Sequence, residues 1–197
     1  TSSLVGSEMC IRDSSTDYVF CGEGETPFKP DDTQAPINVY GQTKYEGELA
    51  VLETPKHFIV RISWVFGRGG KNFVKTMLRL SETHSKLTVV DDQIGAPTYT
   101  RDLSRLLADM AESEKYGIYH ASNSGEYISW YQFAKAIFEE AGKNVEVLPV
   151  SSEEYGAKAR RPFNSRMDCS ALEKNGFEPM PHWRDALKRY LKETEVI

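Results

Sequence analysis

Two short segments of the sequence place a lysine four residues after a tyrosine. One is YGQTK, from Tyr40 to Lys44, and the other is YQFAK, from Tyr131 to Lys135. On a helix, residues four apart lie on the same face, so the ammonium group can stand beside the phenol. A nearby positive charge favours the phenolate and lowers the pKa of a phenol from about 10, which lets a tyrosine give its proton to a carbonyl oxygen. With ten tyrosines in the chain, about one such pair is expected by chance, so the surrounding residues must decide between the copies.

The second copy has the pattern of an ordinary core helix. Its apolar side chains recur at helical spacing, at Ile128, Tyr131, Phe133, Ala134 and Phe138. We therefore expect Tyr131 to pack in the core and Lys135 to be solvated.

The first copy has different surroundings. Tyr40 follows a loop rich in Pro, Asp and Asn and opens a predicted helix, so its hydroxyl can lie at the edge of a cleft. Lys44 can also hydrogen-bond the ribose of a cofactor. Upstream, SSTDYVF places Ser15 and Thr16 at the end of a predicted strand, where a hydroxyl can donate a second hydrogen bond to the same carbonyl oxygen. The alternative is a tyrosine packed under a loop beside an exposed lysine, and the spacing alone leaves both interpretations open.

Strands and helices alternate around these residues. Hydrophobic patterns predict strands at 16–20, 58–62, 86–92, 117–122 and 144–150, and helices at 39–53, 71–82, 101–113, 128–142, 170–176 and 182–193. Alternation with helices of about 10 to 15 residues is typical of a parallel sheet built from crossover units, which makes this an α/β protein. On the helix at 39–53 we expect Val39, Thr43, Glu46 or Gly47, and Ala50 along one side.

The chain contains no GxGxxG turn for a dinucleotide. Gly67, Gly69 and Gly70 in FGRGGKNF are the nearest candidate, but they are more typical of a loop and a helix start.

Composition indicates a globular protein and argues against several classes. The net charge of -5 is mild, and without a Lys/Arg run we expect no nucleic-acid partner. An apolar run of about 18 residues is absent, so no conventional membrane span is expected. Three cysteines without CxxC spacing and four dispersed histidines predict neither a metal site nor a disulfide framework, and they fit a reducing, cytoplasmic setting. His120 is expected to be a core histidine rather than a ligand.

Five segments occur in one order along the chain: STDYVF, PINVYGQTKYEGE, RISWVFGRGGKNFVKTMLRL, VVDDQIGAPTYTRDL and RRPFNSRMDCSALEKNGFEPMPHWRDAL. Over residues 15–193 this series resembles the dTDP-4-dehydrorhamnose reductases of the extended short-chain dehydrogenase/reductase group. The resemblance implies part of a Rossmann-like doubly wound parallel sheet and a smaller α/β substrate-binding domain. It also implies reduction of dTDP-6-deoxy-L-lyxo-4-hexulose to dTDP-L-rhamnose by NADPH or NADH, for bacterial cell-surface polysaccharide.

The same resemblance implies roles for individual residues. Tyr40 would be the proton donor, with Lys44 as its activator and a contact of the cofactor ribose. Thr16 would lie on the sugar carbonyl, and Asp17 beside it would help to bind the substrate. Trp64 would be the aromatic wall of the sugar pocket, although a core tryptophan is the alternative.

Four more residues are weaker candidates for the nucleotide-diphosphate end of the substrate, namely Asn72, Gln93, Thr98 and Arg161. An arginine fork suits a pyrophosphate, but the Arg160–Arg161 pair is equally compatible with a solvated surface.

Two features depart from the family pattern. After STDYVF the family usually has Asp-Gly, whereas this chain has Cys21-Gly22. The family also has a cofactor-binding half before STDYVF, whereas residues 1–14 resemble translated sequencing-adapter sequence, in which Glu8, Arg12 and Asp13 argue against a buried strand. We therefore expect 1–14 to be a non-native leader, 15–82 and 101–121 to be the remaining NAD(P)-binding domain, and 83–100 and 122–197 to be the substrate-binding domain.

Because the cofactor-binding half expected before STDYVF is replaced by residues 1–14, the chain is expected to bind NADPH poorly or not at all and to be an inactive fragment. Two alternatives to a reductase remain. One is a non-catalytic subunit resembling the regulatory subunit of methionine adenosyltransferase, and the other is a sugar-nucleotide epimerase. The sequence does not choose between NADPH and NADH, and it leaves a magnesium requirement and a homodimer open.

Overall fold

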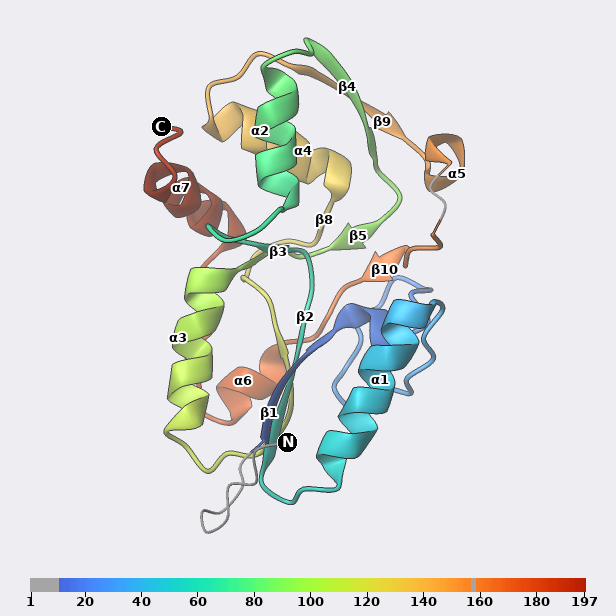
Figure 1. Ribbon diagram of the computed structural model, residues 1–197, viewed down its shortest axis with the longest axis vertical. Coiled ribbons are helices and arrows are strands. Elements are labelled where there is room, and N and C mark those ends of the chain that lie inside the picture. The colour runs from blue at the N-terminus through green and yellow to red at the C-terminus, as the bar shows by residue number, and fades with distance from the viewer. Residues whose placement is uncertain (1–10, 157–158) are drawn as a thin grey trace.

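The computed structural model describes residues 11–156 and 159–197 (Figure 1). In its lower part, a three-stranded parallel sheet has the order β1 (Ile11–Thr16), β2 (His57–Ile62) and β7 (Gly117–Ala121). Helix α1 (Val39–Leu52) lies on one side of this sheet, and α3 (Thr100–Ala111) and α6 (Ser170–Lys174) lie on the other. Side chains of a strand alternate between its two faces. Phe58 and Val60 accordingly join Leu103 and Leu106 of α3 in one apolar cluster, whereas Arg61 points to α1.

Strand β1 corrects two expectations about the start of the chain. Residues 11–14, which we expected to belong to a non-native leader without a buried strand, pair with β2 from Ile11 opposite His57 onward. The strand ends at Thr16, and the predicted strand at 16–20 is instead the 3-10 helix η1 (Asp17–Val19). Residues 1–10 of the expected leader lie outside the described residues.

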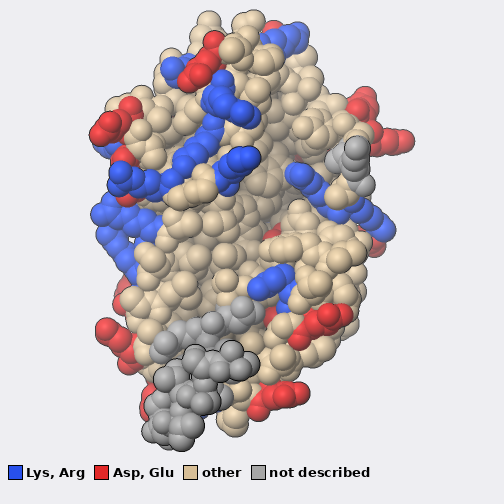
Figure 2. Space-filling view, viewed as in Figure 1, with Lys and Arg blue, Asp and Glu red and all other residues tan. Residues whose placement is uncertain are grey.

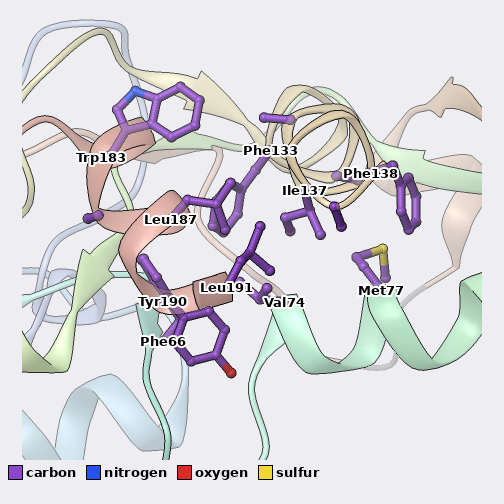
Figure 3. Packing of buried hydrophobic residues seen from close by; sticks show 14 of the residues in the cluster. Phe66, Val74, Met77, Phe133, Ile137, Phe138, Trp183, Leu187, Tyr190 and Leu191 are labelled. Atoms are coloured by element: carbon purple, nitrogen blue, oxygen red, sulfur yellow. The ribbon is translucent and has the colours of Figure 1, made fainter. Parts of the chain in front are cut away.

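The upper part of the molecule is a second packed body. Strand β4 (Lys86–Val90) pairs in parallel with β9 (Glu146–Val150), and α4 (Trp130–Glu140) packs beside this ribbon. Helices α2 (Phe73–Ser81) and α7 (Trp183–Glu193) pack in turn against α4. Figure 3 shows their apolar side chains meeting, with Phe133 and Ile137 of α4 facing Leu187 and Leu191 of α7. Burying each such side chain contributes about 1.5–3 kcal/mol, so this cluster is the main stabilising core of the upper body.

Short strands connect the two bodies. Strand β3 (Val65–Phe66) pairs with β6 (Thr98–Tyr99), and β5 (Ile94–Gly95) lies between β10 (Asn164–Ser165) and β8 (Ile128–Ser129). The short helix α5 (Ser152–Tyr155) follows β9. In the part of the chain that the structure describes, no helix has both the length and the apolar character needed to cross a bilayer.

The packing differs from the expected domain division in two places. Helix α2 was assigned to the cofactor domain with residues 15–82, but its Val74 and Met77 belong to the upper cluster. Helix α6 was assigned to the substrate domain, but its Leu172 belongs to the lower cluster. Periodicity shows that a helix has an apolar face but not which core receives that face. The alternation of strands and helices therefore could not show that α2 joins the upper cluster and α6 the lower one.

Helix α1 has almost no apolar face toward the sheet. The side with Val39, Thr43 and Ala50 faces solvent, because all three residues are exposed and Val39 is 79% exposed. The buried residues of α1 are Gly41 and Glu48. This helix is therefore held by something other than apolar burial.

Basic side chains gather on one face although the net charge is negative. Figure 2 shows Lys and Arg side chains over α2 and α7. Two surface hollows lie there. One is lined by Lys71, Lys75 and Arg79 of a single segment, and the other joins Arg101 and Arg105 with Arg189 and Lys192, which are distant in sequence. Several of these charges are paired, since Arg189 contacts both Asp102 and Asp185. The fold thus concentrates charge that is spread out along the sequence.

Candidate active site

A cleft of about 790 Å³ opens where the carboxyl ends of β1 and β2 meet the upper body. Ligands of open α/β sheets commonly bind at this edge. Four segments line the cleft: residues 14–18, the start of α1 at 37–40 with Lys44, residues 62–65, and Ala159 to Arg161. Trp130 of α4 closes it from above. Thr16, Asp17, Tyr40, Lys44, Trp64 and Arg161, which the sequence proposed as site residues, are therefore brought together here.

Thr16 and Asp17 form the floor of the cleft. The Thr16 hydroxyl donates to Asp17 Oδ1 at 3.0 Å and accepts from the backbone N–H of Tyr18 at 3.3 Å. Asp17 is only 2% exposed, and its Oδ2 has no hydrogen-bond partner among the described residues. Burial raises the pKa of Asp17 to about 6, against the opposing effect of hydrogen bonds from Ser165 and Thr16. An unpaired carboxylate oxygen at a cleft is well suited to accept a hydrogen bond from a ligand.

Tyr40 and Lys44 occupy the first two turns of α1. The helix starts at Asn38, whose side chain accepts from the backbone N–H of Gly41 at 2.8 Å. Tyr40 is 55% exposed, so its phenol is not walled off beneath packed side chains. Its ring meets the ring of Tyr18 edge to face, with centroids 5.6 Å apart and planes at 79°. Both Tyr40 and Lys44 therefore face the same cleft as Thr16.

The second tyrosine–lysine pair lies outside the cleft. Phe133, Ala134 and Phe138 beside it are buried, and Tyr131 packs against the upper cluster. Lys135 is exposed, with its Nζ 5.4 Å from the Tyr131 ring centroid. The prediction of an ordinary core helix is confirmed.

Trp64 forms one wall of the cleft in a strained backbone conformation. Its φ of 49° lies in the left-handed region, which bulky residues rarely adopt and which occurs preferentially at functional sites. Its carbonyl accepts from Thr98 N–H at 3.2 Å, and its ring stacks on Trp130 at 3.7 Å. Trp64 also packs against the upper apolar cluster, so it combines the two roles that the sequence left open.

A smaller cavity of about 310 Å³ adjoins the cleft. Trp130 and Arg161 line both spaces, and Gln93, Phe73 and Met77 line the smaller one. Gln93 Nε2 donates to Ser152 Oγ at 2.8 Å. Arg161 is exposed at the junction, whereas Arg160 makes a surface ion pair with Glu23 at 3.3 Å. The structure therefore brings Gln93 and Arg161 to the proposed site.

Asn72 and Thr98 are not brought to either cavity. Asn72 caps α2 by accepting from Lys75 N–H at 2.9 Å and also donates to Gly67 O at 2.8 Å. The glycine-rich segment before it is thus a loop and helix start, as predicted. Thr98 is fully buried in β6. A polar residue before an amphipathic helix has the same sequence signal whether it caps the helix or binds a ligand, which explains the different outcome for Asn72.

Two aromatic residues of the cleft were missed by sequence reasoning. Tyr18 stands two residues after Thr16, and Trp130 directly follows Ser129, the N-cap of α4. A large aromatic in the first turn of an amphipathic helix lies at the end of the core, where a cleft can begin, so Trp130 carried a weak signal. His120 is fully buried, and no group of His, Cys, Asp and Glu suited to a metal occurs among the described residues.

Gly41 permits the close approach of α1 to η1. A Cβ at this position would lie 2.1 Å from the carbonyl oxygen of Tyr18, a backbone atom that cannot move aside. Gly41→Ala is therefore expected to lower the free energy of unfolding by about 1–3 kcal/mol. Gly47 lies in the same helix, and no atom lies within 4 Å of a Cβ added there. Gly47→Ala should therefore raise the free energy of unfolding by about 0.5–1 kcal/mol. Denaturant unfolding measures both variants, and equal effects would contradict this account.

Comparison with known proteins identifies the family. A protein-family model described as the RmlD substrate binding domain matches residues 7–196. The spore coat polysaccharide biosynthesis protein SpsK of Bacillus subtilis is 51% identical over 180 residues, which cover 91% of this chain and 62% of that protein. A dTDP-4-dehydrorhamnose reductase of Sinorhizobium fredii is 43% identical over 187 residues, covering 89% and 63%.

Solved structures agree with this result. The dTDP-4-dehydrorhamnose reductase of Bacillus anthracis in complex with NADP is 47% identical, with a TM-score of 0.89 over 92% of this chain and 65% of that one. A UDP-N-acetylglucosamine 4-epimerase from Bacillus cereus, only 16% identical with a TM-score of 0.71, shares the Rossmann-like α/β fold. The chain spans less than two thirds of the length of each of these relatives. With nearly its whole length matched by the family model, the chain belongs to the RmlD substrate-binding domain family.

Proposed function

We propose that this chain supplies the proton donor and the sugar-nucleotide site of a dTDP-4-dehydrorhamnose reductase that uses NADPH. The observation that carries the proposal is the gathering of Thr16, Tyr40 and Lys44 in one cleft. The relatives named dTDP-4-dehydrorhamnose reductase, one of them solved with NADP, support the choice of reaction and cofactor.

The residues of the cleft fit a cofactor and a sugar ketone. A half-exposed phenol and Lys44 on an open cleft leave room for a ribose, which Lys44 would hold. When bound, the nicotinamide supplies the hydride that reduces the ketone carbon. The Tyr40 hydroxyl donates its proton to the ketone oxygen, and the Lys44 ammonium favours the phenolate that remains. When substrate binds, the Thr16 hydroxyl would turn its proton from Asp17 Oδ1 to the same oxygen, and the unpaired Oδ2 of Asp17 would accept from a sugar hydroxyl.

The nucleotide end of the substrate is assigned to the smaller cavity. Its aromatic and aliphatic lining with one amide, from Gln93, suits a pyrimidine base, and Arg161 at the junction suits the diphosphate. The proposal retains the expected cytoplasmic setting.

The test follows NADPH absorbance in the full-length protein with dTDP-6-deoxy-L-lyxo-4-hexulose. We expect NADPH to be consumed in step with formation of dTDP-L-rhamnose. An epimerase would convert a sugar nucleotide without consuming NADPH. A non-catalytic subunit would neither consume NADPH nor convert a sugar nucleotide. For these 197 residues alone, calorimetry is expected to detect dTDP binding but little or no NADPH binding. Saturable NADPH binding at micromolar concentration would contradict the expected division of the protein.

A further inference from the structure

Helix α1 is attached to the lower sheet by a buried ion pair. Arg61 of β2 and Glu48 of α1 are each 1% exposed. Arg61 Nε donates to Glu48 Oε1 at 2.9 Å, and Arg61 Nη2 donates to Oε2 at 2.7 Å, so the pair is bidentate. Such a fork fixes both the distance and the orientation of the two side chains.

The same guanidinium makes three further contacts. Its Nη1 donates to the carbonyl of Pro30 at 2.9 Å and lies 3.4 Å from Nε2 of His120. Burial and the Arg61 charge lower the pKa of His120 to about 3, so the imidazole is neutral and its Nε2 can accept this hydrogen. The guanidinium also stands over the Phe20 ring, 5.0 Å from its centroid.

Apart from His120 of β7, each of these partners belongs to a segment that carries a cleft residue. Glu48 lies one turn after Lys44 in α1. Pro30 lies in the loop that leads to Ile37 and Asn38 of the cleft, and Phe20 follows η1, which begins at Asp17. Arg61 itself precedes Ile62, Ser63 and Trp64, which line the opposite wall. One buried side chain therefore connects α1, the loop before it, the end of η1 and β2, each of which leads to cleft residues.

Stability alone does not account for this arrangement. Removing two charges from water is costly, and an apolar pair of similar volume often stabilises a protein as well or better. An apolar pair would not fix orientation, however, and α1 has little other buried surface to do so.

We propose that Arg61 is a positioning residue. It does not touch substrate, but it holds α1 so that Tyr40 and Lys44 stand at the working distance from Thr16. The catalytic consequence rests on the proposed reductase function, whereas the structural consequence does not.

The structural consequence is tested in this chain by nuclear magnetic resonance of labelled tyrosines. Single variants would leave a buried charge without its partner and are expected to unfold, so the informative variant is the double replacement Arg61→Met/Glu48→Leu. We expect the double variant to be folded and to show a cooperative denaturation transition. Its Tyr40 ring signals, assigned with Tyr40→Phe, should lose the shift caused by the edge-on Tyr18 ring. The matched control is Asp102→Leu/Arg189→Met, which removes another bidentate pair, with both distances 2.7 Å, outside the cleft. Its Tyr40 signals should stay in place.

The catalytic consequence is tested in the full-length protein. The Arg61→Met/Glu48→Leu variant should lower kcat by roughly 100-fold, the loss that a misplacement of about 1 Å produces, and should leave KM for the sugar nucleotide within about 3-fold. The control pair should change neither constant. Unchanged Tyr40 signals, or unchanged kcat, in the Arg61 variant would overturn the inference. If the unmodified protein fails to oxidise NADPH, the proposed function fails, and the Tyr40 signals still decide whether Arg61 positions α1.

Discussion

Replacing Tyr40 by phenylalanine should nearly abolish reduction and leave nucleotide binding intact. The variant removes only the hydroxyl that is proposed to give its proton to the ketone. Loss of a positioned general acid costs about 10²- to 10⁴-fold in rate, so kcat should fall within that range. The ring is half exposed and keeps its edge contact with Tyr18, so stability should hardly change. Steady-state NADPH oxidation in the full-length protein measures kcat, and calorimetry with dTDP measures binding.

The chain provides a matched control for this experiment. Tyr131→Phe makes the same substitution in the other tyrosine–lysine pair, whose residues do not line the cleft. We expect it to leave kcat within about 2-fold, because a phenol outside the cleft cannot reach the ketone. Full turnover in Tyr40→Phe would assign the proton to another group. If Tyr40→Phe altered only the affinity for a protein partner, the non-catalytic subunit would be favoured.

The fold class was predictable because local patterns carry it. The run FIVRI predicted the buried strand β2, and the segment around Phe133 and Phe138 predicted α4. The attachment of elements to the two cores was not predictable. Val74 and Leu172 are apolar residues on amphipathic helices, and no local signal distinguishes the core that each one joins.

Cleft residues that follow a local sequence pattern could be predicted. Contacts between residues distant in sequence could not be predicted. The spacing of Tyr40 and Lys44 and the position of Thr16 at a strand end were compatible with one site, and the resemblance of the surrounding segments to a known family favoured it. The Arg61–Glu48 pair left no such trace, because a charged residue within an apolar strand and a glutamate in a polar helix each look solvated until the fold brings them together. Asn72 illustrates the converse, since its polar side chain is used by the backbone of α2.

Replacing Asp17 by asparagine should stabilise the protein above about pH 6. The folded state raises the pKa of this carboxyl from 3.8 to about 6 because the side chain is buried, so between these values the folded state binds more protons than the unfolded one. The contribution of Asp17 to the free energy of unfolding therefore falls as pH rises through this window, by about 3 kcal/mol in total. Asparagine has nearly the same shape and no charge to desolvate, so it avoids this loss.

The difference between the variant and the unmodified chain is the quantity to measure. His120 has the opposite effect, since its folded pKa of about 3 lies below the usual 6.5 and its contribution to stability rises with pH between these values. Subtracting the two denaturation series removes His120, and the remaining difference should grow from pH 4 to pH 6 and then level off. Asp31→Asn, at an exposed carboxyl, should give a flat difference.

The same Asp17→Asn variant should bind the sugar nucleotide more weakly, because a neutral amide oxygen accepts a hydrogen bond less strongly than a carboxylate. A gain in stability without that loss would separate Asp17 from substrate binding, and a flat stability difference would show that its carboxyl is not held in a desolvated state.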